Sequence, residues 1–342
     1  MKKILLAATA LSLSAGGLML SAGSADAQNV SIGNADLRFG GYARFGIDYR
    51  DDRPDTVTDD RWRTTNRFRL QLDLTTTTDT GITFGARQRF QIDNGAGATG
   101  NQVRFFATFE GLTVAFGNIL GVIESTPNLY LTGVPSAGTG LNGNGFFSLA
   151  ANTVSNQGVF GWTAYSSGGA SATNGVEALY TFGDFTVHAH STDDRTLATV
   201  DGVVDRAGSR SEAIGVRGTF ADVTVGLGYE RWRRGNRDGD EILFASAGYN
   251  IGEGNVSLSY ARTDYNDMTA DKWSLSGGWN VMPDLYTYGF VAHENNDVGT
   301  SYGIGASYAL GGGASFEAGY SRGRQANGDG VNVFSAGVFF SF

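Results

Sequence analysis

The sequence predicts an all-β fold: a transmembrane antiparallel β-barrel of about 16 strands with a long, inward-folded constriction loop. Three observations support this. Apolar and polar residues alternate in segments along the chain, short and long connections tend to alternate between them, and the last segment ends on Phe342. Side chains alternate across a strand, so each segment has two unlike faces. Strands cross a bilayer only as a closed barrel, because an unpaired backbone N–H or C=O group finds no hydrogen-bond partner in lipid.

The first 27 residues read as a secretory signal peptide. Lys2 and Lys3 form a positive segment, Ile4 to Leu20 is apolar with small residues, and Ala25-Asp26-Ala27 supplies a cleavage pattern. We expect cleavage before Gln28 and a single barrel domain over residues 28–342. The alternative is one spanning helix, but the apolar run is short and a polar stretch follows it.

Composition excludes several classes of function. The formal net charge is −9, which argues against a nucleic-acid partner, and the absence of cysteine rules out cysteine-based metal motifs. The chain contains no G-x-x-x-x-G-K-[ST], H-E-x-x-H or G-x-S-x-G motif. We therefore expect no enzymatic activity and no cofactor, with calcium as one exception considered below.

About 16 segments alternate with a period of two and are predicted to be strands. In chain order they are Leu37–Arg50, Trp62–Leu74, Ile82–Ile92, Val103–Phe109, Leu112–Phe116, Val176–Phe182, Phe185–Ala189, Ile214–Phe220, Val223–Tyr229, Leu243–Ile251, Val256–Tyr260, Trp273–Val281, Leu285–Ala292, Tyr302–Leu310, Phe316–Tyr320 and Val331–Phe342. Val159–Tyr165 also alternates. A strand there would put two long connections at the wrong rim, so we assign it to the long connection.

Short turns at one rim and longer loops at the other are typical of outer-membrane barrels. A secreted sandwich or β-helix also alternates, but strands of about ten residues, aromatics at strand ends and the signal peptide favour the membrane. The candidates for an aromatic girdle are Tyr42, Trp62, Tyr229, Tyr249, Trp273, Trp279, Tyr286, Tyr288, Tyr302, Tyr308 and Tyr320.

Arginines recur on the polar face of the first four strands. An Arg facing lipid would cost roughly 2–4 kcal/mol at the midplane, so these side chains are predicted to line the lumen. They are Arg44, Arg67, Arg69, Arg87, Arg89 and Arg104. Two interpretations stay open: the arginines pair with acidic neighbours and keep the lumen wet, or they form a selective cluster.

The connection Ile119–Asn174 is far longer than usual loops, and such loops are mostly functional or disordered. Its apolar residues allow it to pack inside the barrel and narrow it, and its one carboxylate is Glu124. If Glu124 faces the arginines, a transverse field crosses the narrowest point. A second interpretation is that Glu124 caps a short helix in the loop, and the two interpretations are compatible.

Other polar residues are predicted to have structural roles. Glu177, Glu230 and Glu317 fall on the lumen face, where salt bridges within the wall are expected, and His188 and His190 share that face without a third metal ligand. Acidic residues also gather in the longer loops, and hard divalent cations prefer such oxygen ligands. The calcium candidates are Asp51, Asp52, Asp55, Asp59 and Asp60.

The chain resembles the general bacterial porins, most closely the alphaproteobacterial, Rhodobacter-type branch. The matching pieces are Phe39-Gly40-Gly41-Tyr42 in the opening strand, Leu112–Asn118, Pro127–Tyr130 and the terminal Phe342. The resemblance implies a 16-stranded homotrimer whose third extracellular loop, residues 119–174, folds inward. It also implies that Glu124 faces the six arginines at the constriction. Family members often carry several carboxylates on this loop, so a cation preference does not transfer by analogy.

From these observations we predict a passive outer-membrane channel of a Gram-negative bacterium for small hydrophilic solutes and ions, surrounded by outer-membrane lipid and lipopolysaccharide. The resemblance further implies that Phe342, with Phe340 and Val338, belongs to a signal read by the barrel-assembly machinery. The alternatives are a substrate-specific channel with a sugar or anion site, a structural or adhesive barrel, and a hydrolytic outer-membrane barrel.

Overall fold

The computed structural model describes most of the chain outside the first 28 residues and several loops. The described residues are 29–52, 61–93, 99–130, 160–167, 174–193, 197–200, 203–206, 210–234, 237–266, 268–295, 299–324 and 329–342. The predicted signal peptide, the greater part of the long connection, and Asp55, Asp59 and Asp60 therefore lie outside the described residues.

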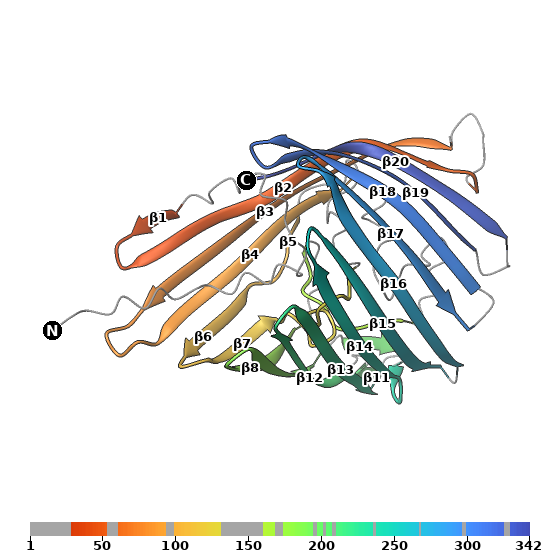
Figure 1. Ribbon diagram of the computed structural model, residues 1–342. Coiled ribbons are helices and arrows are strands. Elements are labelled where there is room, and N and C mark those ends of the chain that lie inside the picture. Colours follow the sequence, from red (N-terminus) through yellow and green to blue (C-terminus); the bar gives the residue numbers. More distant parts are fainter. Residues whose placement is uncertain are drawn as a thin grey trace.

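Sixteen of the described strands form the wall of a barrel (Figure 1). They are β2 (Ala35–Arg50), β3 (Trp62–Thr77), β4 (Thr83–Asp93), β6 (Arg104–Phe109), β7 (Leu112–Asn118), β8 (Asn174–Phe182), β9 (Phe185–Thr192), β12 (Arg210–Phe220), β13 (Val223–Arg234), β14 (Glu241–Ile251), β15 (Gly254–Tyr265), β16 (Met268–Met282), β17 (Leu285–Glu294), β18 (Gly299–Gly311), β19 (Ala314–Arg324) and β20 (Gly330–Ser341).

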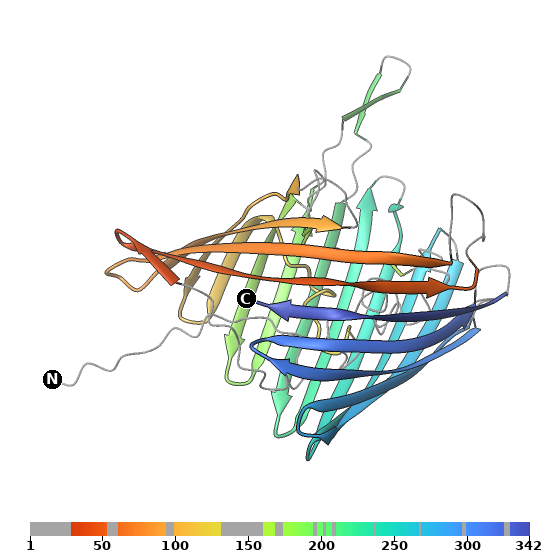
Figure 2. The same ribbon diagram turned by 90° about the horizontal axis from the view of Figure 1, so that it is seen from above.

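Four shorter strands add to this wall or stand apart from it. β1 (Asn29–Ile32) pairs with the start of β2, and β5 (Thr99–Gly100) pairs with β4. β10 (Leu197–Val200) and β11 (Val203–Arg206) form a separate hairpin that extends away from the barrel (Figure 2). Among the described residues there is no helix with the length and apolarity needed to cross a membrane.

The barrel closes between its last and first wall strands. Each wall strand pairs antiparallel with the next, and β20 pairs with β2. At the seam, the Gly41 N–H donates to the Phe342 carbonyl at 2.9 Å and the Phe342 N–H donates to the Gly41 carbonyl at 3.1 Å. The predicted antiparallel barrel of 16 strands is therefore confirmed. Residues 160–167 contain no strand, as expected of the long connection.

The rim that carries the short connections is built from tight turns. Between β6 and β7, Glu110 has a φ of 44° and Gly111 a φ of 85°. Both central residues of a type I′ turn need positive φ, and the twist of this turn matches that of the flanking strands. A two-residue turn of this kind fixes the register of the β6–β7 hairpin, and thereby places Arg104 in the lumen.

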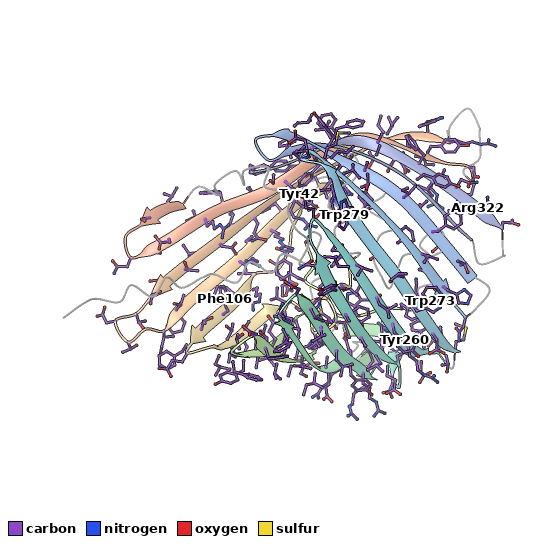
Figure 3. The ribbon with its side chains drawn as sticks, viewed as in Figure 1. Tyr42, Phe106, Tyr260, Trp273, Trp279 and Arg322 are labelled. Carbon is purple, nitrogen blue, oxygen red and sulfur yellow. The ribbon has the colours of Figure 1, made fainter. Side chains whose placement is uncertain are left out.

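The outer surface is apolar, with aromatic residues near the strand ends. Tyr260, Trp273 and Arg322 lie toward one end of the barrel and Trp279 toward the other (Figure 3). Most of the predicted girdle residues are at least partly exposed outside, but three predictions are wrong. Tyr42 contacts lumen arginines, and Tyr286 and Tyr288 are each only 3% exposed. Strand parity places these three inside, where the Tyr286 hydroxyl accepts a hydrogen bond from Asn255.

Candidate functional site

The long connection enters the barrel directly after β7 and is held there by side chains of the wall. The Leu120 N–H donates to Glu177 Oε2 at 2.9 Å, and the Val122 N–H donates to His190 Nδ1 at 3.1 Å. Both acceptors are buried wall residues. The two hydrogen bonds carry the backbone of the loop off the strand and onto the inner face of β8 and β9.

Beyond this entry the loop packs into a hydrophobic core inside the lumen. Ile123 and Leu129 of the loop are completely buried, and a cluster of wall residues on β13, β14 and β15 surrounds them. The wall members of this cluster are Trp232, Ile242, Phe244 and Ala261. Tyr130, Phe160 and Trp162 pack against the same cluster from the loop. An apolar patch facing a water-filled lumen would be unfavourable on its own, so the patch and the loop cover each other.

Glycines on the inner face of the wall leave room for the loop. A Cβ atom on Gly228 would lie 2.8 Å from Ile123 Cδ1, and one on Gly226 would lie 2.7 Å from Pro127 Cδ. Both separations are too short for carbon atoms in contact. The glycines that approach the loop in this way are Gly215, Gly226, Gly228 and Gly248. They form a shallow path along which the loop crosses β12 to β14.

A second set of polar contacts holds the returning part of the loop, residues 160–167. The Thr163 N–H donates to Glu230 Oε2 at 3.0 Å, and the Thr163 hydroxyl also bonds this carboxylate. Arg237, from the β13–β14 connection, stacks 3.5 Å from the ring centroid of Trp232 and donates to the Gly161 carbonyl at 3.4 Å. The end of this segment turns toward β4 and β7, where the Ser166 carbonyl accepts from Asn118 Nδ2 at 2.9 Å and the Ser167 hydroxyl accepts from Arg89 Nη1 at 3.2 Å.

Glu124 is the carboxylate that this loop presents. Its oxygens accept hydrogen bonds from the Tyr130 hydroxyl and from Trp162 Nε1, the latter at 2.7 Å. Burial raises the pKa of Glu124 above its ordinary value, and the two hydrogen bonds and the nearby charges of Arg89 and Arg69 oppose that rise only in part. Residues 119–130 contain turns and no helix, so the helix-capping interpretation of Glu124 is wrong.

Three of the six predicted arginines are neutralised by carboxylates of the wall. Arg67 pairs with Asp93, Arg87 pairs with Asp73 at 2.6 Å, and Arg104 pairs with Glu177 at 2.7 Å. The Arg104 pair is almost completely buried, and His188 Nε2 lies 3.0 Å from the same carboxylate. These three arginines hold the wall together.

Arg69 and Arg89 are different, because each is held by a neutral amide. Arg69 Nε donates to Gln91 Oε1 at 2.8 Å, and Arg89 Nε donates to Gln71 Oε1 at 2.6 Å. Their guanidinium groups lie over aromatic rings, 5.0 Å from the Tyr42 centroid and 4.6 Å from the Tyr165 centroid. Within the described part of the chain, no ion pair joins either arginine to a carboxylate.

The remaining candidates are placed as follows. Arg44 is buried at 4% exposure, and the charges of Arg67 and Arg69 lie close to it. Of the calcium candidates, Asp51 accepts hydrogen bonds from Asn332 and Asp52 pairs with Arg50 at 2.7 Å. No group of three or more metal-ligating side chains occurs among the residues that the structure describes.

The roles of Gln71 and Gln91 were missed from the sequence, although a signal for them exists. Residues 67–73 and 87–93 both read Arg-x-Arg-x-Gln-x-Asp. The two segments pair antiparallel as neighbouring strands, so each first Arg meets an Asp and each second Arg meets a Gln. The repeat, combined with the register, would have separated the paired from the unpaired arginines. Tyr130, Trp162 and Tyr165 gave no such signal, since their placement depends on the fold of the loop.

Comparison with known proteins agrees with this architecture. The family model of the Gram-negative porins matches residues 7–339. A porin from Fuscovulum blasticum is 26% identical over 285 residues, which cover 80% of this chain and 90% of that protein. The porin of Rhodobacter capsulatus is 26% identical over 337 residues, covering 90% of this chain and 100% of its own length.

The solved structures show the same fold. A triple mutant of Rhodopseudomonas blastica porin superposes with a TM-score of 0.69 at 24% identity, over 90% of this chain and 100% of that one. The match to the family model extends over nearly the whole sequence and includes both walls of the constriction. The chain therefore belongs to the Gram-negative porin family and is a non-enzymatic diffusion channel of the outer membrane.

Proposed function

We propose that this channel selects small hydrophilic solutes by size and charge where the loop faces the β3–β4 wall. The observation that carries the proposal is the opposition of Glu124 to Arg69 and Arg89. The charges of both arginines act on the Glu124 carboxylate, yet no ion pair joins them within the described residues. A gap between opposite charges in a narrow, partly dehydrated passage produces a strong transverse field.

The direct test removes the positive side of this field. Replacing Arg67, Arg69, Arg87 and Arg89 by alanine should shift ion selectivity toward cations, because four positive charges disappear while Asp73 and Asp93 remain. We expect the ratio of cation to anion permeability to rise roughly tenfold, as focusing of charge in clefts allows. The measurement is the reversal potential in planar bilayers under a salt gradient. An unchanged reversal potential in a conducting channel would contradict the proposal.

The negative side of the field should depend on pH. Because the pKa of Glu124 is raised, this carboxylate takes up its proton at a higher pH than an ordinary glutamate, whose pKa is about 4.3. As the pH falls toward that range, Glu124 should be protonated before ordinary carboxylates are. The ion selectivity of the channel should then shift toward anions. Glu124→Gln should show the anion-shifted state at neutral pH. Superimposable pH titrations of reversal potential for the variant and the native channel would refute this assignment.

Four further parts of the proposal concern export and assembly. Residues 1–27 act as a signal peptide, the mature chain forms a single barrel domain, and three barrels associate as a homotrimer. Phe342, Phe340 and Val338 form the terminal signal for the barrel-assembly machinery. The position of Phe342 supports this, because it lies at the seam that closes the barrel, with its ring 5.8 Å from that of Phe68. We also propose calcium binding at the loop of Asp51 and Asp52, which calcium titration with and without a chelator tests through the thermal stability of the channel.

A further inference from the structure

The repeated Arg-x-Arg-x-Gln-x-Asp segments build an array with an approximate local two-fold axis. In the antiparallel register of β3 and β4, Arg67 lies opposite Asp93 and Asp73 lies opposite Arg87, as the two outer rungs. Between them are two inner rungs, in which an arginine lies opposite a glutamine. All eight side chains fall on the lumen face, since they alternate with outward residues such as Phe68 and Phe90.

Hydrogen bonds link each half of the array into a chain. Arg89 Nε donates to Gln71 Oε1, Gln71 Nε2 donates to Asp73 Oδ2 at 2.6 Å, and Asp73 also accepts from Arg87. The other half repeats this order. Arg69 Nε donates to Gln91, Gln91 Nε2 donates to Asp93 Oδ2 at 2.6 Å, and Asp93 accepts from Arg67. Each glutamine thus orients an inner arginine through its carbonyl oxygen and donates its own N–H to the outer carboxylate.

The arrangement leaves charge only at its centre. Four arginines and two aspartates leave two positive charges, and these belong to Arg69 and Arg89, whose nearest hydrogen-bond acceptors are neutral. The two residues are diagonal neighbours across the strand pair, a separation of about 7–8 Å that long side chains can bridge. Both side chains are partly exposed.

The surroundings also favour an incoming anion. Tyr42 and Tyr165 lie against the two guanidinium groups and fix their planes. Residues 119–174 contain a single carboxylate, Glu124, and its two oxygens are occupied by Tyr130 and Trp162. Besides its Nε, Arg89 also uses Nη1, which donates to the Ser167 hydroxyl at 3.2 Å, again a neutral acceptor. A guanidinium group has five N–H donors, so each arginine has further terminal donors to offer to the oxygens of an anion.

We propose that Arg69 and Arg89 form a binding site for small oxyanions, oriented by Gln71 and Gln91, and that solutes carrying a phosphate or carboxylate group bind there during passage. This inference rests on the proposed charge selection at the constriction and adds a ligand class to it. Neutral sugars and cations offer no oxyanion to the two guanidinium groups, so they pass through the channel without binding at this site.

The test uses the complete channel in a planar bilayer with inorganic phosphate as the probe. At pH 7 and constant KCl, added potassium phosphate should lower the single-channel conductance along a saturating curve, because a bound oxyanion delays chloride. Sodium succinate and sodium acetate, tested in the same way, separate phosphate from carboxylate ligands by their half-blocking concentrations. A conductance that only rises in proportion to added phosphate, succinate and acetate would overturn the proposal.

The decisive variant leaves both arginines in place. Gln71→Glu with Gln91→Glu is nearly isosteric and gives each inner arginine a carboxylate partner, so the half-blocking concentration should rise roughly tenfold or more. Thr108→Glu is the matched control, because Thr108 lies on the lumen face of β6, where its hydroxyl bonds Thr113, and adds a carboxylate to the same lumen. It should retain the block. Block that persists in the glutamate double variant would also overturn the proposal.

A second variant guards against misfolding of the first. Arg69→Gln with Arg89→Gln removes the two charges and should abolish the block, whereas Arg322→Gln removes a charge from the outer face and should not. The outcomes separate the two proposals. If the reversal potential responds to the alanine variants but no oxyanion blocks the channel, only the binding site fails. If the reversal potential does not respond, the charge selection itself fails.

Discussion

Phe244→Ala is expected to release the constriction loop and to raise the single-channel conductance. Phe244 is completely buried in the cluster that holds Ile123 and Leu129 inside the lumen. Replacing a buried phenylalanine by alanine costs about 3–5 kcal/mol, through lost burial and the cavity left behind. Since the loop supplies two of the six buried residues of this cluster and all three side chains that pack against it, most of that cost falls on the docking of the loop. The barrel wall, which its own strand ladder maintains, should still assemble.

Two measurements check this expectation. Single-channel recording should show a larger mean conductance with more frequent transitions, and limited proteolysis should cleave the loop faster than in the native channel. Leu258→Ala is the control, because Leu258 is 55% exposed on the outer face, whereas the described residues of the loop pack against the inner face. A native conductance and a native cleavage rate in the Phe244 variant would show that the loop is held by other contacts.

Glu177→Leu should produce the largest loss of stability. This carboxylate accepts hydrogen bonds from Arg104 Nε and the Leu120 N–H, and lies 3.0 Å from His188 Nε2. Its removal deprives the buried Arg104 guanidinium group and the Leu120 N–H of this acceptor at the same time. Breaking a buried ion pair from one side costs about 3–5 kcal/mol, because the remaining charge stays desolvated. The free energy of unfolding, measured by urea titration of the refolded channel in lipid, should fall by about that amount.

Conservative and distant variants make this result interpretable. Glu177→Gln keeps the shape and part of the hydrogen bonding, so its loss should be clearly smaller. Glu253→Leu removes an exposed carboxylate from the β14–β15 turn and should change the free energy of unfolding by roughly 0.5 kcal/mol or less. If Glu177→Leu were no more destabilising than Glu253→Leu, the network around Glu177 would have no net stabilising effect.

The strands and their faces were predictable because alternation reports the two environments of a barrel wall directly. Arg67, Arg69, Arg87 and Arg89 could be placed in the lumen on this ground alone. Their pairing could not, because it depends on the register of β3 against β4, which alternation does not specify. A shift of the pairing by two residues would keep every face and change every partner.

The hydrophobic core between the loop and the wall could not be predicted from the sequence for a related reason. Ile242, Leu243 and Phe244 are consecutive apolar residues, so alternation cannot show which of them face lipid. The structure places Ile242 and Phe244 inside, against the loop. Tyr286 and Tyr288 were misassigned for the opposite reason, because aromatic residues near strand ends suggested a girdle while parity points them inward. In both cases the side chains are buried on the inner face of the wall, an environment that alternation alone does not reveal.

The docking of the loop also constrains the order of folding. The Ser246 hydroxyl donates to the Pro127 carbonyl across a sequence separation of 119 residues, and the loop core needs β13, β14 and β15 as well. Contacts this distant form late, since the entropy of closing the intervening chain must be overcome first. The passage therefore narrows only after the later strands have joined the wall, and a barrel halted before that stage would leave the membrane leaky.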